Sequence, residues 1–162
     1  MYCLSGRKDR GKKTVVGVHW ATHTGCGSVQ DEEDAIDDEE VLLRRIPTRP
    51  DFMNPAAGSR PSRMAFRPRE DDQTGLSVFR ERYISAVDLC RNSEGKRFYV
   101  ARFLARDIRA VGMDVRPRRN GPKPGHAEII SLTFENRKDD KSETWQIFMA
   151  RELEMDVVGP HP

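Results

Sequence analysis

The sequence has no long hydrophobic run and few cysteines. No stretch of about 18 apolar residues is present, which excludes a membrane-spanning helix, and the N-terminus has no apolar segment typical of a secretory signal. The three cysteines, Cys3, Cys26 and Cys90, are an odd number at irregular spacing, so no disulfide framework is expected. These absences predict a cytoplasmic protein with reduced thiols and no membrane partner.

The motifs of familiar enzymes are also missing. The sequence contains no Gly-x-Ser-x-Gly nucleophile motif and no glycine-rich loop of the kind that binds phosphates. The acidic residues of the expected folded part show no catalytic spacing. These absences argue against the common hydrolases and nucleotide-dependent enzymes, although an unfamiliar enzyme stays open, and we expect no cofactor.

One set of residues in the sequence could in principle form a zinc site. Cys3, His19, His23 and Cys26 supply four nitrogen and sulfur ligands, and the two histidines have a spacing that zinc sites use. Zinc fingers normally also have a close pair of cysteines, whereas Cys3 and Cys26 are far apart in a region with no other sign of a fold. We therefore predict no metal site.

Charged residues are abundant and nearly balanced. The 162 residues are 36% hydrophobic and 33% charged, with a net charge of +2, so bulk charge does not indicate a partner. The length fits one domain. Of the 28 basic residues 21 are arginine, which forms forked contacts with carboxylates and phosphates better than lysine does; a GC-rich genome would produce the same bias.

The chain divides into a polar N-terminal part and a folded part. Residues 1–30 are basic and glycine-rich, and eight of the ten residues in 31–40 are acidic. Like charges at that density repel one another and remain solvated. We predict a flexible tail over residues 1–40 and a single α+β domain over residues 41–158.

Hydrophobic periodicity predicts the elements of this domain. We expect a small mixed sheet packed by two or three helices. Residues 41–46 fit a short strand or the end of a helix, and the proline-rich residues 47–75 fit an irregular loop. The remaining strands are expected at 75–80, 113–116 and 126–134, and the helices at 81–90, 98–111 and 144–153.

A loop rich in arginine and serine is the first candidate binding site. Residues 58–69 hold four arginines among hydroxyl and backbone donors, and such a loop can hold an anion. The alternative is that these arginines only tie the loop to Asp71 and Asp72. The ligand-binding candidates from the loop and the strand that follows it are Arg60, Ser62, Arg67, Ser77 and Arg80.

His126 is the candidate acid or base. It is the one histidine within the expected folded region, because His161 lies at the extreme C-terminus. It follows a rigid turn at the start of an expected strand. An imidazole there can face a cleft and titrate near neutrality. The alternative is a structural histidine that bonds to a neighbouring carbonyl.

A basic face is the third candidate. Residues 91–125 contain ten basic and three acidic residues, and Arg102, Arg106 and Arg109 would share one side of the expected helix at 98–111. A nucleic-acid backbone could bind such a surface, although no aromatic platform accompanies it. Alternatively, the same surface could receive the acidic run at 31–40 of the same chain.

Several short motifs carry a family resemblance. Leu42-Leu-Arg-Arg-Ile-Pro47, Arg60-Pro-Ser-x-x-Ala-Phe66, Gly75-Leu-Ser-Val78, Tyr99-Val-Ala-Arg-Phe103 and Gly125-His-Ala-x-Ile129 together resemble a family of small bacterial proteins with no known activity. The similarity covers residues 42–132. It implies a bacterial protein with a single domain, and it implies no reaction. Arg63 departs from the small residue expected after Ser62.

Three functions follow from these candidates. The leading prediction is a small bacterial accessory module that binds a protein partner and has an anion-binding loop. The alternative is an enzyme that acts on a phosphate-bearing or nucleotide-like substrate through Arg60, Ser62 and His126. The third is nucleic-acid binding through Arg102, Arg106 and Arg109.

Overall fold

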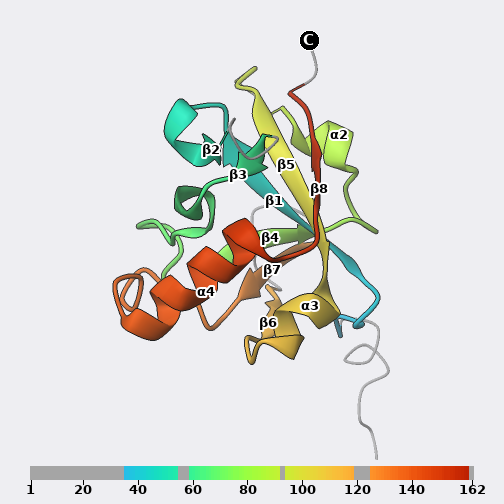
Figure 1. The fold of residues 1–162 in the computed structure, drawn as a ribbon. Coiled ribbons are helices and arrows are strands. Elements are labelled where there is room, and N and C mark those ends of the chain that lie inside the picture. The colour runs from blue at the N-terminus through green and yellow to red at the C-terminus, as the bar shows by residue number, and fades with distance from the viewer. Residues whose placement is uncertain (1–34, 55–58, 92–93, 119–124, 161–162) are drawn as a thin grey trace, which may run out of the picture.

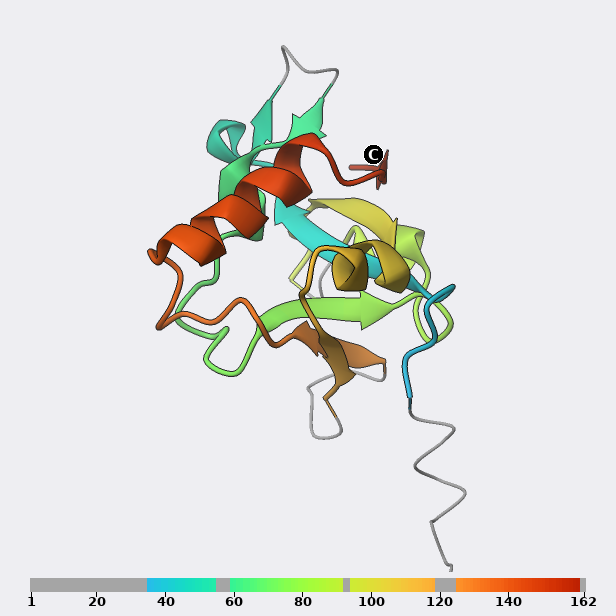
Figure 2. The ribbon, with the colours of Figure 1, turned by 60° about the horizontal axis from the view of Figure 1, so that its bottom comes forward.

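A computed structural model describes residues 35–54, 59–91, 94–118 and 125–160. Its centre is a six-stranded sheet in the order β6-β7-β4-β1-β5-β8 (Figures 1 and 2). All pairings between these strands are antiparallel, whereas a mixed sheet was expected. The sheet is packed by helices, which confirms the α+β prediction. The strands are β1 Val41–Pro47, β4 Leu76–Arg80, β5 Phe98–Leu104, β6 Val115–Pro117, β7 His126–Ile129 and β8 Asp156–Val158.

Shorter elements complete the described residues. A small hairpin joins β2 Met53–Asn54 to β3 Arg60–Pro61, and single 3-10 turns flank it at η1 Pro50–Phe52 and η3 Arg63–Phe66. The α-helices are α2 Ala86–Leu89, α3 Ala105–Ala110 and α4 Asp140–Arg151. Ser62 begins η3 by accepting a hydrogen bond from the Met64 amide, and Ser85 begins α2 by accepting one from the Asp88 amide.

The two faces of the sheet are covered differently. On one face, Leu42 and Ile46 of β1 join the main core together with Ile108 of α3 and Met149 of α4, and both helices lie on this side in Figure 2. On the opposite face, Leu43 belongs to a smaller core that includes α2. Because side chains alternate along a strand, β1 and β5 each contribute apolar side chains to both cores.

The helix predicted over residues 98–111 is wrong. The structure has the strand β5 first, and α3 begins only at Ala105. Val100, Phe103 and Ile108 fit a helical stripe, but Val100 and Ala101 are both fully buried because β5 is a central strand with a core on each face. A strand of this type has no clear alternation and can be mistaken for a helix.

Other elements were placed correctly but with different ends. β1, β4, β6 and β7 lie where strands were predicted, and β1 is a strand rather than the end of a helix. The helix expected at 81–90 is reduced to α2, because a turn occupies the residues before Ser85. The last helix starts at Asp140, four residues before the predicted position.

The end of the predicted tail packs against the domain. Ile36 is only 6% exposed and belongs to the main core. Glu40 forms an ion pair with the buried Arg80, and the amides of Ala105 and Arg106 donate to the carbonyls of Glu40 and Asp38. The predicted boundary at residue 41 therefore falls inside the packed domain. Residues 1–34 of the predicted tail, with the four zinc-ligand candidates, lie outside the described residues.

Candidate functional site

The structure separates the candidate site residues into different places. Ser77 and His126 line one cavity, whereas Arg60 and Ser62 line a groove elsewhere on the molecule. The enzyme alternative requires Arg60, Ser62 and His126 to lie in one pocket. The structure does not bring them together. Arg80 is only 2% exposed and bonds to Glu40, so its guanidinium serves the interior of the domain.

The cavity lies where β1 and β4 diverge. The two strands pair only at Leu42 with Arg80 and at Leu43 with Phe79, and beyond this point they separate (Figure 2). The guanidinium of Arg44 occupies the gap and donates to the carbonyl of Ser77 at 2.6 Å. A cavity of about 270 Å³ opens beside it, lined by Arg44, Arg45, Pro47, Arg69, Asp71, Asp72, Ser77, Phe79, Phe98 and His126.

Asp72 holds one wall of this cavity in place. Its carboxylate accepts from the Ser77 amide at 2.9 Å and from the Arg69 amide at 2.9 Å. The carboxylate also lies 3.8 Å from a guanidinium nitrogen of Arg44. Both side chains of this pair are buried, and burial lowers the pKa of Arg44. Arg44 and Asp72 satisfy one another, and therefore build the wall rather than offer free charge to a ligand.

His126 projects from β7 on the same face of the sheet as Ser77. It is 5% exposed, its ring stacks on Phe79 with centroids 5.2 Å apart, and its Nε2 lies 3.1 Å from the Ser77 hydroxyl. Its Nδ1 is buried and has no hydrogen-bond partner in the described structure. Burial lowers the pKa of His126, and Arg118 lowers it further, while Glu128 and Asp72 oppose the shift. The neutral imidazole is therefore the favoured form.

Arg45 contributes a second unsatisfied group. Its Nε donates to the carbonyl of Leu89 at 3.2 Å, and its guanidinium lies over the ring of Phe98 at 4.7 Å. Its Nη2 is buried and lacks a partner among the described residues. Buried polar groups of native proteins are nearly always paired. In the described part of the chain Arg45 Nη2 and His126 Nδ1 are the two buried side-chain atoms left unpaired, and both residues line this cavity.

The buried histidine predicts a dependence of stability on pH. Because the pKa of His126 is lowered in the folded protein, folding favours the neutral ring, and this contribution is present above the ordinary pKa of 6.5. It is lost as the pH falls below 6.5 and the unfolded chain takes up the proton first. The unfolding free energy of the wild type should therefore decrease more steeply over this range than that of His126→Phe, measured by urea denaturation at several pH values. Parallel curves would contradict this account.

Arginines predicted to form a nucleic-acid surface are paired with carboxylates. Arg102 bonds to Glu81 with two hydrogen bonds of 2.8 Å, and it projects from β5 rather than from a helix. Arg106 contacts Glu39, and Arg109 contacts Asp38. The described end of the acidic run, through Asp38 and Glu39, thus lies against two of these arginines, in keeping with the alternative interpretation of the basic face.

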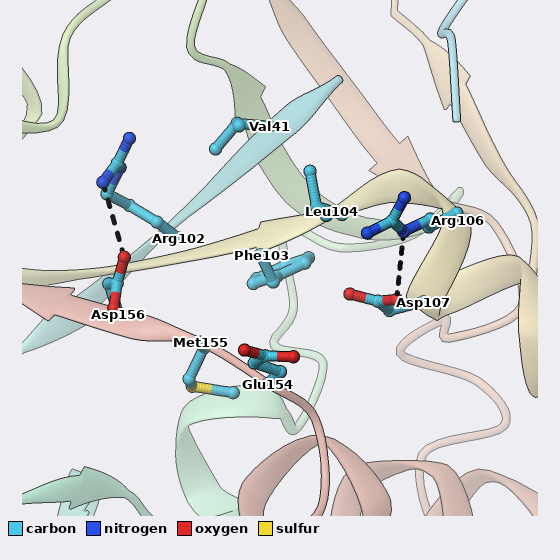
Figure 3. A pocket seen from close by; sticks show the side chains of 9 residues that line it. All are labelled: Val41, Arg102, Phe103, Leu104, Arg106, Asp107, Glu154, Met155 and Asp156. Atoms are coloured by element: carbon cyan, nitrogen blue, oxygen red, sulfur yellow. Dashed lines mark ion pairs between the residues drawn. The ribbon is translucent and has the colours of Figure 1, made fainter. Parts of the chain in front are cut away.

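A pocket beside these arginines carries both signs of charge. Figure 3 shows Arg102 next to Asp156 and Arg106 next to Asp107, with Glu154 and Met155 between them on the lower side. The lining contains three carboxylates and two guanidiniums. A phosphate backbone would therefore meet mixed charge at this surface, where the sequence indicated an excess of basic residues.

Further comparisons add no homologue. Comparisons of the chain with models of protein families, with curated proteins and with solved structures found no match. Within the described ranges no three His, Cys, Asp or Glu side chains are grouped so that they could hold a metal ion. None of the described helices is long and apolar enough to span a membrane.

Sequence reasoning identified Ser77 and His126 but missed most of their surroundings. Arg44, Arg45 and Asp72 were not candidate ligand residues. A signal for the first two was present, because two arginines inside an otherwise apolar strand must find partners when the strand is buried. Three short sequence segments, at residues 42–47, 75–78 and 125–129, supply Arg44, Arg45, Pro47, Ser77 and His126 of the lining.

Proposed function

We propose that the protein binds a small anionic ligand in the cavity between β1 and β4. The observation that carries this proposal is that the two unpaired buried groups, Arg45 Nη2 and His126 Nδ1, belong to residues that line the same cavity. An unpaired buried donor costs about 1–3 kcal/mol, and a ligand with oxygen acceptors would remove that cost.

The charge and size of the cavity support an anion. The lining has three guanidiniums and two carboxylates, and Arg44 and Asp72 already pair with one another. The remaining charges are the guanidiniums of Arg45 and Arg69 and the carboxylate of Asp71, so the lining has a net positive charge. When the Ser77 hydroxyl donates to Nε2 of the neutral ring, Nδ1 carries the hydrogen and is a second unpaired donor. A volume of about 270 Å³ suits a small molecule, and Phe79 and Phe98 offer it apolar walls.

Carboxylates and phosphate monoesters share the chemistry that this site recognises. Both present two or more oxygens to a guanidinium and a ring N–H. The titration of His126 gives a further signature, because a bound anion favours the protonated ring and raises its pKa. Binding should therefore take up protons and strengthen as the pH falls.

The test is ligand binding by calorimetry with two matched variants. Acetate, benzoate and inorganic phosphate serve as probes, and the wild type should bind at least one of these classes saturably. Arg45→Met keeps the side-chain stem over Phe98, and His126→Phe keeps the ring on Phe79, while each removes one donor. Each variant should weaken binding by about tenfold, which corresponds to about 1.4 kcal/mol.

The control is Arg49→Ala, which removes an exposed arginine that pairs with Asp51. It should bind the probes as the wild type does. If the wild type binds none of the probes, or if Arg49→Ala weakens binding as much as Arg45→Met, the proposal is overturned.

The accessory function with a protein partner stays a prediction beside this one. Two large hydrophobic side chains of the described surface are exposed, Tyr83 at 46% and Val87 at 58%. They lie four positions apart around the start of α2. A protein contact at this place would leave the cavity and its ligand undisturbed, because neither side chain lines it.

A further inference from the structure

A second basic site lies at the predicted arginine loop. A groove of about 410 Å³ runs between the small hairpin β2–β3 and the C-terminal half of α4. Its described lining residues include Arg60, Arg63 and Arg151 but no carboxylate, and Ser62 and Asn54 add polar groups. Three guanidiniums without an opposing acid on the lining distinguish this groove from both pockets described above.

Arg60 is held in a fixed position in the groove. Its Nε donates to the carbonyl of Ala150 at 3.2 Å, and its Nη2 donates to the carbonyl of Leu153 at 2.6 Å. These carbonyls lie at the C-terminal end of α4, where the helix dipole would repel an anion. Arg60 covers them with two of its five N–H groups, which leaves its positive charge and further donors near the groove.

The other two arginines are more accessible. Arg63 lies 3.6 Å from Glu143, and both side chains are nearly half exposed, so this ion pair is weak and screened by salt. Arg151 is exposed and forms no ion pair with any described residue. A ligand can therefore recruit both guanidiniums with little loss of existing contacts.

We propose that this groove binds a small phosphorylated molecule through Arg60, Arg63 and Arg151. Guanidiniums form forked hydrogen bonds with phosphate oxygens, and a chain of phosphates can engage several of them together. Pro61, Ile147 and Ala150 also line the groove and offer an apolar surface to the organic part of the ligand. Among the described residues this site shares no lining residue with the cavity that holds His126, so it is independent of the function proposed for that cavity.

The test uses inorganic tripolyphosphate and a nucleoside triphosphate as probes, titrated into the full chain at low salt without divalent metal. The wild type should bind at least the nucleoside triphosphate saturably. The double variant Arg63→Ala/Arg151→Ala leaves Arg60 and its two carbonyl contacts intact, and it should weaken binding by tenfold or more. Tighter binding of the nucleoside triphosphate than of tripolyphosphate would show that the apolar surface contributes, and equal binding would show that the phosphates alone are recognised.

Two controls make the result specific. Arg49→Ala/Arg116→Ala removes the same charge from two exposed arginines outside the groove, and it should bind both probes as the wild type does. His126→Phe should also leave this binding unchanged. Absence of saturable binding, or an equal loss in the control double variant, would overturn the proposal, because the interaction would then be missing or would reflect only overall charge.

Discussion

Replacing Arg80 with methionine should lower the free energy of unfolding by about 3–5 kcal/mol, the usual cost of removing one partner of a buried ion pair. Arg80 is 2% exposed, and it donates to Glu40 at 2.6 and 2.8 Å and to the carbonyl of Ala35 at 2.9 Å. The side chain of Glu40 is itself only 7% exposed. The substitution would therefore leave a carboxylate in the interior with Arg82, 3.3 Å away and partly exposed, as its nearest charge.

Urea denaturation would measure this loss. The double variant Arg80→Met/Glu40→Leu removes both charges and should recover much of the stability, since apolar replacements of a buried pair are often tolerated. Arg49→Ala breaks the exposed pair with Asp51 and should cost less than about 1 kcal/mol. A loss at Arg80 no larger than that at Arg49 would show that the buried pair is not a principal support of the fold.

Gly125→Ala should destabilise the protein by about 2–3 kcal/mol, because two unfavourable effects coincide there. Its φ of +73° lies in the left-handed region, which costs most residues about 1–2 kcal/mol. A Cβ at this position would also lie 2.5 Å from the Cβ of Tyr83. Both atoms are close to the backbone, so the collision can be relieved only by moving the chain beside His126.

Gly95 provides the matched control for this position. Its φ is +75°, and a Cβ there meets no atom within 4 Å. Gly95→Ala should therefore show only the conformational cost of about 1–2 kcal/mol. Thermal or urea unfolding of the two variants gives the difference that is due to Tyr83. Equal losses would mean that Tyr83 moves aside without cost, and in that case ligand binding at His126 should also be unaffected by Gly125→Ala.

The sequence was sufficient to predict the strands and helices that have one buried face or a clear boundary residue. The strands β4 and β7 follow glycines and contain clear apolar residues, and the long helix α4 has apolar positions at helical spacing. It was insufficient for β5, because burial on both faces removes the alternation that identifies a strand. It also placed the start of the domain too late. The acidic run was assigned to a solvated tail, whereas its last residues form ion pairs with arginines of the domain.

The candidate site was only partly predictable for a related reason. Ser77 and His126 were recognised as polar residues at strand positions, and strand pairing brings Ser77 beside Glu128 and Phe79 beside His126. The partners of these residues come from β1 and from the loop before β4, and no spacing in the sequence shows that β1 and β4 diverge after two pairs. Arg60 and Ser62 were grouped with His126 because they are polar, whereas the fold places them against α4.

The outermost strands of the sheet have a consequence for the behaviour of the protein at high concentration. An open sheet edge can recruit a strand of another molecule and begin aggregation. Here β6 and β8 are each three residues long, β6 ends in Pro117, which has no N–H to donate, and β8 begins with the charged Asp156. Short, proline-ended or charged edges are poor templates for strand addition. The sheet is thus protected against edge-to-edge growth at both ends.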